Sequence, residues 1–296
     1  GTLDALIYSG SSDVFKENRL AMKKILGKAM LYGQQKQNSR ATGQQELFEN
    51  KSESFSVGHD NVNLALKVDN TIDNRLRSLS LEKKVIGFYL SGHPIKEYQE
   101  EITSMSIKSI ASYFDKLYSA DIDDDFSEHG TVSGVITNIR SQRMGKDRFI
   151  NILSVDDSTH RLEIILFSDV YEKYRNLIKE NEVLFFSGVI AMDDYNGDLS
   201  MKATKVIDMD SARQQYSKEI ELFISSEHIN DNILERIVCL LEPHKNGKCP
   251  LIIKCLSNQH IVPLELDNEW LINPSSTLIN GLSDLLGKEN IIVKYE

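Results

Sequence analysis

"TVSGVITNIRSQRM" at residues 131–144 opens a series of β-rich runs that decides the fold of the chain. Its β-branched residues stand at partly alternating positions, a pattern typical of a half-buried strand. Short polar interruptions follow, "GKD" after the first run and "STH" after the second. The complete series, in chain order, is "TVSGVITNIRSQRM" (131–144), "RFINILSVDD" (148–157), "RLEIILFS" (161–168), the helical "DVYEKYRNLI" (169–178), "NEVLFFSGVIAMDD" (181–194) and "LSMKATKVIDM" (199–209).

Five strands with a helix between the third and the fourth follow the order of an OB-fold β-barrel. Gly134 in the first strand and Gly188 in the fourth suit the strong coiling that a small barrel requires. We therefore expect a five-stranded OB-fold domain at residues 128–211. Barrels of this kind bind oligonucleotides across strands two and three and through the first and fourth loops.

Positive charge gathers between the first two expected strands. Residues 139–148 carry four basic side chains against one acid, Asp147, and Phe149 follows with a face on which a base could stack. Residues 131–210 carry 10 basic and 13 acidic residues, so contact with single-stranded DNA is expected to be weak and salt-sensitive. The alternative is a solvated hairpin loop. The expected single-stranded-DNA-binding residues are Arg140, Arg143, Lys146, Arg148 and Phe149.

The segments on either side of the barrel differ in kind. Residues 1–40 read as helix, whereas residues 36–63 are rich in Ser, Asn, Gln and Gly and indicate a flexible linker. A second helix at about residues 70–90 is expected to end at Gly92, with Pro94 as a stop. About 80 residues after the barrel alternate as β-α-β-β-α-β. The fold class is therefore multidomain α+β: a helical segment and flexible linker, then a five-stranded OB-fold β-barrel, then a small C-terminal α+β (β-α-β-β-α-β) domain.

Composition limits the partners and the compartment. The chain has 296 residues and a formal net charge of -10, which argues against a surface that binds polyanions everywhere. No apolar run approaches the ~20 residues needed to span a bilayer, and no signal-peptide pattern is present. We expect a cytoplasmic protein without membrane contact. Cys239, Cys249 and Cys255 have no CxxC spacing, so we expect reduced thiols, the last two in the core, and no metal site.

An acidic stretch precedes the barrel. "ADIDDDFSEHG" at residues 120–130 places Asp121, Asp123 and Asp125 at alternate positions, where one face of a strand could hold the metal ions of a phosphoryl-transfer site. The flanks are polar, however, and Asp is depleted in strands. We expect a solvated connector with no catalytic or metal-binding residue; a metal-dependent nuclease centred on these aspartates is the alternative.

A short apolar motif stands in the polar linker. "GQQELF" at residues 43–48 brings two large side chains, Leu47 and Phe48, together in a segment dominated by polar residues. Such a pair either docks in the apolar pocket of a partner or pins the linker locally. The residues alone leave both interpretations open.

"GFYLSGHPIKEY" at residues 87–98 resembles the G-x-Y-x-S-G-H-P segment of the bacterial replicative DNA polymerase III alpha subunit family. The order of the segments around it agrees with the C-terminal third of that family. The resemblance implies five parts: 1–43, the helical end of an upstream DNA-binding (helix-hairpin-helix) region; 44–69, the clamp-binding peptide and linker; 70–127, a helical connector with the GHP segment; 128–211, the OB-fold domain; and 217–296, a C-terminal clamp-loader (tau)-binding domain.

By this resemblance the chain is a tethering region of a replicative DNA polymerase catalytic subunit. The implied partners are the sliding clamp (beta subunit), the tau subunit of the clamp loader and, weakly, single-stranded template DNA. The palm of that nucleotidyltransferase lies elsewhere in the family, so no catalytic residue and no cofactor is expected here, and Mg serves the parent polymerase. The residues alone also allow a stand-alone OB-fold nucleic-acid-binding adaptor. The implied clamp-binding residues are Gln44, Gln45, Glu46, Leu47 and Phe48.

Overall fold

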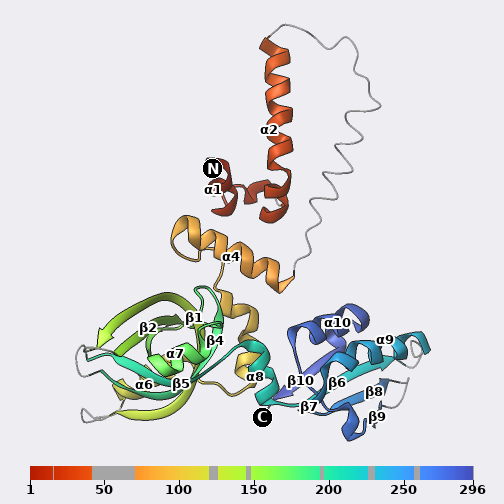
Figure 1. The fold of residues 1–296 in the computed structure, drawn as a ribbon. Coiled ribbons are helices and arrows are strands. Elements are labelled where there is room, and N and C mark those ends of the chain that lie inside the picture. Colours follow the sequence, from red (N-terminus) through yellow and green to blue (C-terminus); the bar gives the residue numbers. More distant parts are fainter. Residues whose placement is uncertain are drawn as a thin grey trace. The chain divides into compact units, whose positions relative to one another are not determined.

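In a computed structural model, the chain divides into two units (Figure 1). The first unit, Gly1–Glu97, is helical, and the second, Tyr98–Glu296, holds two β-sheets. The structure describes residues 1–15, 17–41, 71–119, 126–144, 148–193, 197–225, 231–256 and 261–295.

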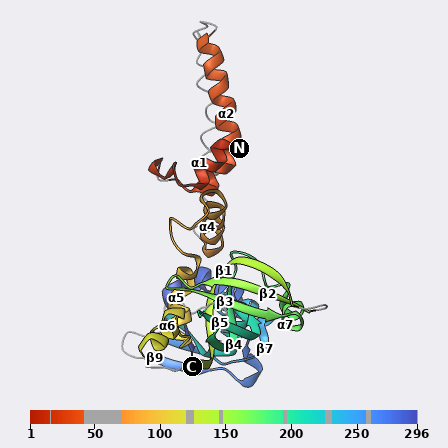
Figure 2. The same ribbon diagram turned by 90° about the vertical axis from the view of Figure 1, so that its left-hand side faces the viewer.

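The first unit packs the first and third helices against the beginning of the second. Its small core is made by Ile7 of the first helix, Leu20 and Ala21 of the second and Leu79 of the third, all of them buried. The second helix has 23 residues and extends well past this core (Figure 2). The elements are α1 (Thr2–Tyr8), η1 (Asp13–Phe15), α2 (Arg19–Ala41), α4 (Ile72–Ile86) and η2 (Pro94–Tyr98).

A buried carboxylate on α4 organises the turn that follows this helix. Glu82 is 0% exposed. Its Oε1 accepts hydrogen bonds from the backbone N–H groups of Leu90 (2.5 Å) and Ser91 (2.7 Å). Its Oε2 accepts from the Ser91 hydroxyl and from Nη1 of Arg19, each at 2.5 Å. Burial by itself raises the pKa of Glu82, but the hydrogen bonds from Ser91 and Arg19 outweigh it, so the pKa lies below its usual value.

Helix α4 ends earlier than the sequence predicts, so the expectation of a cap at Gly92 is wrong. The helix stops at Ile86, and Gly87 caps it with a φ of 97°. Glycine adopts this left-handed conformation without a Cβ penalty. Residues 88–91 then turn back toward Glu82, whose carboxylate accepts hydrogen bonds from the backbone N–H groups of Leu90 and Ser91.

Five strands of the second unit form a closed barrel in the order β1-β2-β3-β5-β4. Only β3 and β5 pair in parallel, and β4 pairs with the first half of β1 to complete the ring. With helix α7 between β3 and β4, this order confirms the predicted OB-fold. The elements are α6 (Ile110–Ser119), β1 (Ser127–Met144), β2 (Arg148–Asp156), β3 (Arg161–Phe167), α7 (Ser168–Tyr174), β4 (Val183–Met192) and β5 (Leu199–Ile207).

Two glycines allow the barrel strands to approach one another closely. A Cβ atom at Gly134 would lie 2.4 Å from Cγ1 of Val155, and one at Gly188 would lie 2.2 Å from the carbonyl oxygen of Lys202. Neither position has room for a side chain. The interior is filled by aliphatic and aromatic side chains, among them Val132, Ile136, Leu153, Val155, Ile164, Leu166, Phe186, Ile190 and Met201.

Helix α6 is fixed to the barrel by the turn between β2 and β3. Asp157 is 5% exposed and accepts a hydrogen bond through Oδ2 from the backbone N–H of Ile110 at 2.7 Å. Its Oδ1 accepts from the backbone N–H groups of Thr159 (2.8 Å) and His160 (3.0 Å). One carboxylate therefore satisfies donors at the start of the helix and in the turn.

The last part of the chain is a four-stranded sheet in the order β10-β6-β8-β9. The predicted β-α-β-β-α-β order is confirmed, and the short strand β7, which precedes β8, is an addition that the sequence did not predict. Helix α8 was not predicted. The elements are α8 (Met209–Tyr216), β6 (Ser217–Ser225), α9 (Asp231–Leu241), η3 (Glu242–His244), β7 (Lys245–Cys249), β8 (Leu251–Leu256), β9 (Ile261–Glu265), η4 (Asn268–Trp270), α10 (Ser276–Leu286), η5 (Lys288–Asn290) and β10 (Ile291–Tyr295).

A buried arginine on α8 gathers polar groups from several elements. Arg213 contacts Glu101 of helix α5 (Gln99–Ser104), Asp210 of its own helix and the hydroxyl of Ser276 at the start of α10. The Tyr295 hydroxyl donates a hydrogen bond to the same Glu101 carboxylate. Burial and the negative charge of Glu101 raise the pKa of Tyr295, so its hydroxyl stays protonated.

Candidate nucleic-acid interface

The structure places the expected DNA-binding residues on strands more than on a loop. Arg140 and Arg143 belong to β1, which continues to Met144, and β2 begins at Arg148. Residues 139–144 are therefore paired with β2 as a two-stranded arm and do not belong to a loop. Lys146 lies outside the described residues.

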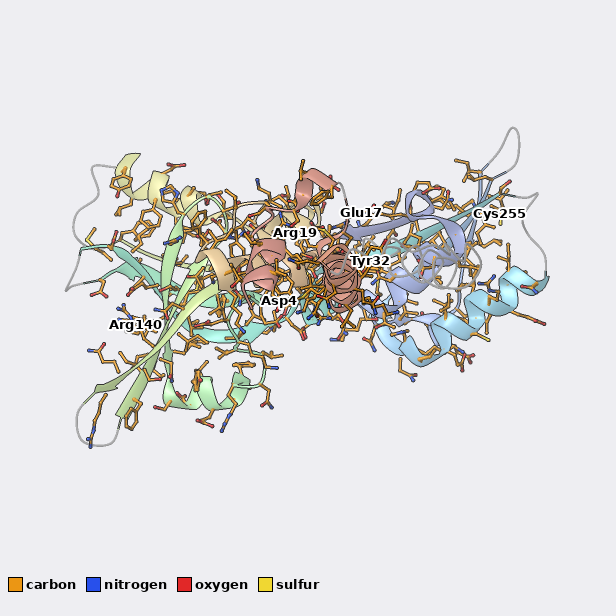
Figure 3. The ribbon with its side chains drawn as sticks, turned by 90° about the horizontal axis from the view of Figure 1, so that it is seen from above. Asp4, Glu17, Arg19, Tyr32, Arg140 and Cys255 are labelled. Carbon is orange, nitrogen blue, oxygen red and sulfur yellow. The ribbon has the colours of Figure 1, made fainter. Side chains whose placement is uncertain are left out.

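Arg140 lies on the outer face of the barrel. Its neighbour across the ladder is Ile152 of β2, whose side chain points away from the core that Leu153 enters. Nη2 of Arg140 is 2.5 Å from Oε1 of Glu163 on β3 (Figure 3 shows Arg140 on the barrel strands). Glu163 therefore compensates much of the positive charge of Arg140.

Arg143 and Phe149 form a cross-strand pair near the end of the arm. Directly opposite residues share a face, so the guanidinium and the ring lie on the same side. Because Arg140 and Arg143 are three residues apart in a regular ladder, they point to opposite faces. Phe149 is 50% exposed, which leaves its ring available for stacking. The predicted residues therefore divide between two faces.

The outer face contains a row of residues that follows the strand register. Across β1, β2, β3 and β5 the successive neighbours are Arg140, Ile152, Ile165 and Lys202. Two cations thus flank two isoleucines. Phe167, two residues beyond Ile165 on the same strand, lies on this face and is 45% exposed. We call these five residues the outer row.

The outer row has the features of a surface that binds single-stranded nucleic acid. Cations contact the phosphate backbone, and an exposed ring offers a stacking surface that tolerates any base. Sequence reasoning missed Lys202 and Phe167. Phe167 could have been found from the sequence, because an aromatic residue ends the third predicted strand. Lys202 could not, because it lies beside Ile165 only through the pairing of β3 with β5.

The start of β2 is fixed to the start of α7. The Ser168 hydroxyl donates a hydrogen bond to the backbone carbonyl oxygen of Phe149 at 2.6 Å. This contact holds the strand that carries Phe149 to the residue that follows Phe167. The positions of the two exposed rings are thereby linked through the backbone.

Several expected sites lie beyond what the structure describes. The clamp-binding residues Gln44, Gln45, Glu46, Leu47 and Phe48 are outside the described ranges, and so are Asp121, Asp123 and Asp125. Among the residues that are described, no three His, Cys, Asp or Glu side chains come together to hold a metal ion. In the same ranges no helix is long and apolar enough to cross a membrane.

The cysteines are free thiols in different environments. Cys249 is buried, Cys255 is partly buried and Cys239 is exposed on α9. Burial raises the pKa of the Cys249 thiol to about 11, with a smaller contribution from the negative charge of Glu219. The expectation of a core thiol is confirmed for Cys249.

The barrel and the last domain each match a known protein family. Residues 131–209, which form the barrel, match the family described as "OB-fold nucleic acid binding domain". Residues 236–287 match the family described as "DNA polymerase III subunit alpha, C-terminal domain".

Relatives named DNA polymerase III subunit alpha align with nearly the whole chain. The relative from Escherichia coli (strain K12) is 28% identical over 298 residues and covers 99% of this chain. The relative from Pasteurella multocida (strain Pm70) is 26% identical over 295 residues and covers 100% of it. These alignments confirm the resemblance inferred from residues 87–98. The chain spans about a quarter of the length of these relatives, 24% in both cases.

A solved structure of the second single-stranded DNA binding protein (SSBb) from Mycobacterium smegmatis resembles part of the chain. It is 18% identical, covers 29% of this chain and 92% of that protein, and has a TM-score of 0.26. The score is too low to support any conclusion about function, so the OB-fold assignment is taken from the strand order and the family match.

Proposed function

We propose that this chain is the C-terminal tethering region of the catalytic subunit of a replicative DNA polymerase. The observation that carries the proposal is the similarity to DNA polymerase III subunit alpha along 99% of the chain. In this role the chain contributes no chemistry and holds the polymerase to its template and its accessory proteins. It binds single-stranded DNA, the sliding clamp and the tau subunit of the clamp loader.

Single-stranded DNA lies across the outer row of the barrel. Phe167 stacks on a base, while Lys202 and Arg140 contact phosphates on either side of the isoleucines. Glu163 on the same face forms an ion pair with Arg140, so the net positive charge of the outer row is small. The interaction is therefore weak and falls steeply as salt is added.

Fluorescence anisotropy with a labelled thymidine oligomer tests the outer row. Phe167→Ala removes a stacking surface worth about 1–3 kcal/mol per base, so we expect at least a fivefold loss of affinity. Tyr118→Ala on α6 is the matched control, since Tyr118 is 76% exposed and lies outside the row. Lys202→Ala should weaken binding and lower the salt dependence, whereas Lys179→Ala should not. Equal affinities of the Phe167→Ala and Tyr118→Ala chains for the oligomer would show that the outer row does not bind single-stranded DNA.

The linker peptide binds the sliding clamp through Gln44, Gln45, Glu46, Leu47 and Phe48. Two adjacent apolar side chains in a polar segment suit an apolar pocket, where buried anchors supply most of the binding energy. Helix α2 ends at Ala41, three residues before the peptide, and α4 begins at Ile72. The peptide therefore belongs to a connection between two helices of one unit.

The last domain binds the tau subunit of the clamp loader. Its match over residues 236–287 to the C-terminal domain family of the alpha subunit supports this assignment. Surface plasmon resonance with purified tau on the immobilised chain tests it. Saturable binding is expected, whereas a stand-alone OB-fold adaptor would bind neither tau nor the clamp.

The chain has no nucleotidyl-transfer activity of its own and requires no cofactor, and Mg serves the parent polymerase. The acidic stretch with Asp121, Asp123 and Asp125 is a connector. Incubation with a primed template, nucleotides and Mg should give no extension. Extension that is lost in Asp123→Ala would assign catalysis to this stretch and contradict the proposal.

A further inference from the structure

The helical first unit buries few of its large apolar side chains. Among its described residues, the buried ones are Ile7, Leu20, Leu79 and Ile95, whereas ten others are exposed. Single exposed apolar residues are ordinary on a protein surface, but exposed apolar residues that gather in one place mark a contact with another surface. The question is therefore whether any of the ten gather.

Two segments of this unit meet at one atom of Arg19. Its Nη2 donates hydrogen bonds to Oδ2 of Asp13 at 2.5 Å and to the hydroxyl oxygen of Ser91 at 2.8 Å. The short helix η1 and the turn after α4 are therefore neighbours, although they are far apart in sequence. The turn is held firmly, because the buried carboxylate of Glu82 accepts hydrogen bonds from its backbone.

Each of these segments carries two exposed apolar side chains. Val14 and Phe15 in η1 are 78% and 70% exposed, and Phe88 and Leu90 in the turn are 56% and 65% exposed. We call these four residues the apolar cluster. Because the segments that carry it are already fixed, a partner that covers the cluster loses little binding energy to ordering it.

The charges beside the apolar cluster do not suit a nucleic acid. Arg19, on which both segments converge, is paired with the carboxylates of Asp13 and Glu82. A phosphate backbone is bound by cations that can contact it directly. The cluster therefore suits an apolar protein surface.

The sliding clamp does not fit the position of the cluster. The proposed clamp peptide begins at Gln44, three residues after α2 ends at Ala41, whereas the cluster surrounds Arg19, the first residue of α2. The helix separates these two ends by roughly 33 Å (Figure 2 shows its length). A clamp held by the peptide is thus expected near the far end of α2.

We propose that the apolar cluster is covered by the catalytic part of the same polymerase subunit. The inference rests on the proposed function, in which this chain is the C-terminal region of that subunit. The chain spans 24% of its relatives, so most of such a polypeptide lies outside the structure. An attached partner has an effective concentration on the order of millimolar, which is enough for a small apolar contact.

Such a contact would determine the direction of α2. Arg19 is both the first residue of α2 and the residue that joins the two segments of the cluster. Docking of the cluster on the catalytic part therefore orients the helix that leads to the clamp peptide.

Hydroxyl-radical footprinting of the 296-residue chain and of the full-length subunit, both without DNA, tests the proposal. The oxidation rate of a side chain follows its exposure, and an interface core is packed as densely as a protein interior, so Phe15, Phe88 and Leu90 should react at least about fivefold more slowly in the full-length subunit. Phe149 of the barrel, 50% exposed, is the matched control and should react equally in both proteins.

Two results would overturn the proposal. One is equal, fast oxidation of the cluster in both proteins. The other is slow oxidation in both, together with a dimer of the 296-residue chain in sedimentation, because a second copy would then cover the cluster.

A double substitution separates docking from folding. Phe88→Ser combined with Leu90→Ser should restore fast oxidation of Phe15 in the full-length subunit, because the contact that shields Phe15 is lost. In the 296-residue chain the same pair should leave the rate of Phe15 unchanged and shift the thermal midpoint by less than about 2 °C. Slow oxidation of Phe15 in the full-length variant would contradict the proposal. Clamp binding by the 296-residue chain tests the proposed function separately, because the cluster is exposed in that chain.

Discussion

Arg213 and Glu101 form a two-point ion pair, with Nε 2.7 Å from Oε1 and Nη2 2.8 Å from Oε2. The two residues are 112 positions apart in sequence, and Arg213 is 4% exposed. The pair joins α5, which precedes the barrel, to α8, which precedes the last sheet. Because Arg213 is almost completely buried and Glu101 is only 21% exposed, removal of one partner leaves a largely buried charge without compensation.

Arg213→Ala should lower the free energy of unfolding by about 3–5 kcal/mol, since Glu101 and Asp210 lose their shared cation. Arg213→Lys should cost less, because an ammonium keeps the charge but loses the two-point geometry. Urea unfolding followed by circular dichroism measures both. Arg175→Ala, in an exposed pair with Glu172, is the control and should change the value by less than about 0.5 kcal/mol. A loss in Arg213→Ala no larger than in the control would show that the pair is not structural.

Glu82 should make the helical unit sensitive to acid. Its folded pKa is below the unfolded value, so its stabilising contribution is complete above about pH 4.3 and is lost as the pH falls through the folded pKa. Glu82→Gln keeps the volume but removes the charge that faces Arg19. We expect Glu82→Gln to be less stable at neutral pH, by about 3 kcal/mol, with a smaller difference in acid. Urea unfolding at several pH values measures this, and a difference that does not shrink in acid would contradict it.

Cys249 should be unreactive in the folded protein, because the thiolate is the reactive form and burial raises the pKa of this thiol to about 11. Exposed Cys239 should react quickly with a disulfide reagent near neutral pH. The stabilisation from the protonated Cys249 thiol is complete below its unfolded pKa of about 8.5 and is lost as the pH rises through about 11. Cys239→Ser should remove the fast phase of labelling; a fast phase that persists would show that another cysteine is accessible.

Glu163→Gln should strengthen single-stranded DNA binding. The change removes an acid from the outer face and releases Arg140 from its ion pair. We expect about a threefold gain in affinity at low salt. The slope of log affinity against log salt should become steeper by about 1, since one more phosphate contact is made. Glu180→Gln, on an exposed glutamate outside the outer row, should give neither change. Weaker binding by Glu163→Gln would mean that the carboxylate holds Arg140 in its binding position.

The strands were predictable because their β-branched residues and polar turns act locally. The nucleic-acid interface was harder to predict from the sequence, because its residues become neighbours only when the strands pair. Arg140 and Arg143 are close in sequence but lie on opposite faces, whereas Ile165 and Lys202 are far apart in sequence and lie side by side. A shift of one position in the register would exchange the faces on which Arg140 and Arg143 lie and would place another residue beside Ile165, and the sequence does not reveal the register.

The end of α4 shows a similar limit. Gly87 and Gly92 are both reasonable caps by residue type, and the choice between them depends on the buried carboxylate of Glu82. Arg19, from another helix, helps to compensate that buried carboxylate, together with the hydroxyl of Ser91. Local signals suggest where a helix can end, and tertiary contacts select the position.

The most direct test of the tethering role is the affinity of the 296-residue chain for purified sliding clamp, measured by surface plasmon resonance. The comparison is between the unaltered chain, Leu47→Ala with Phe48→Ala, and the control Phe55→Ala with Val57→Ala, which removes two apolar residues from the same linker. We predict saturable binding that the control retains and that the Leu47 and Phe48 variant loses by more than about tenfold, because the two anchors supply most of the binding energy. Equal binding by all three chains, or no binding by the unaltered chain, would contradict the proposed role.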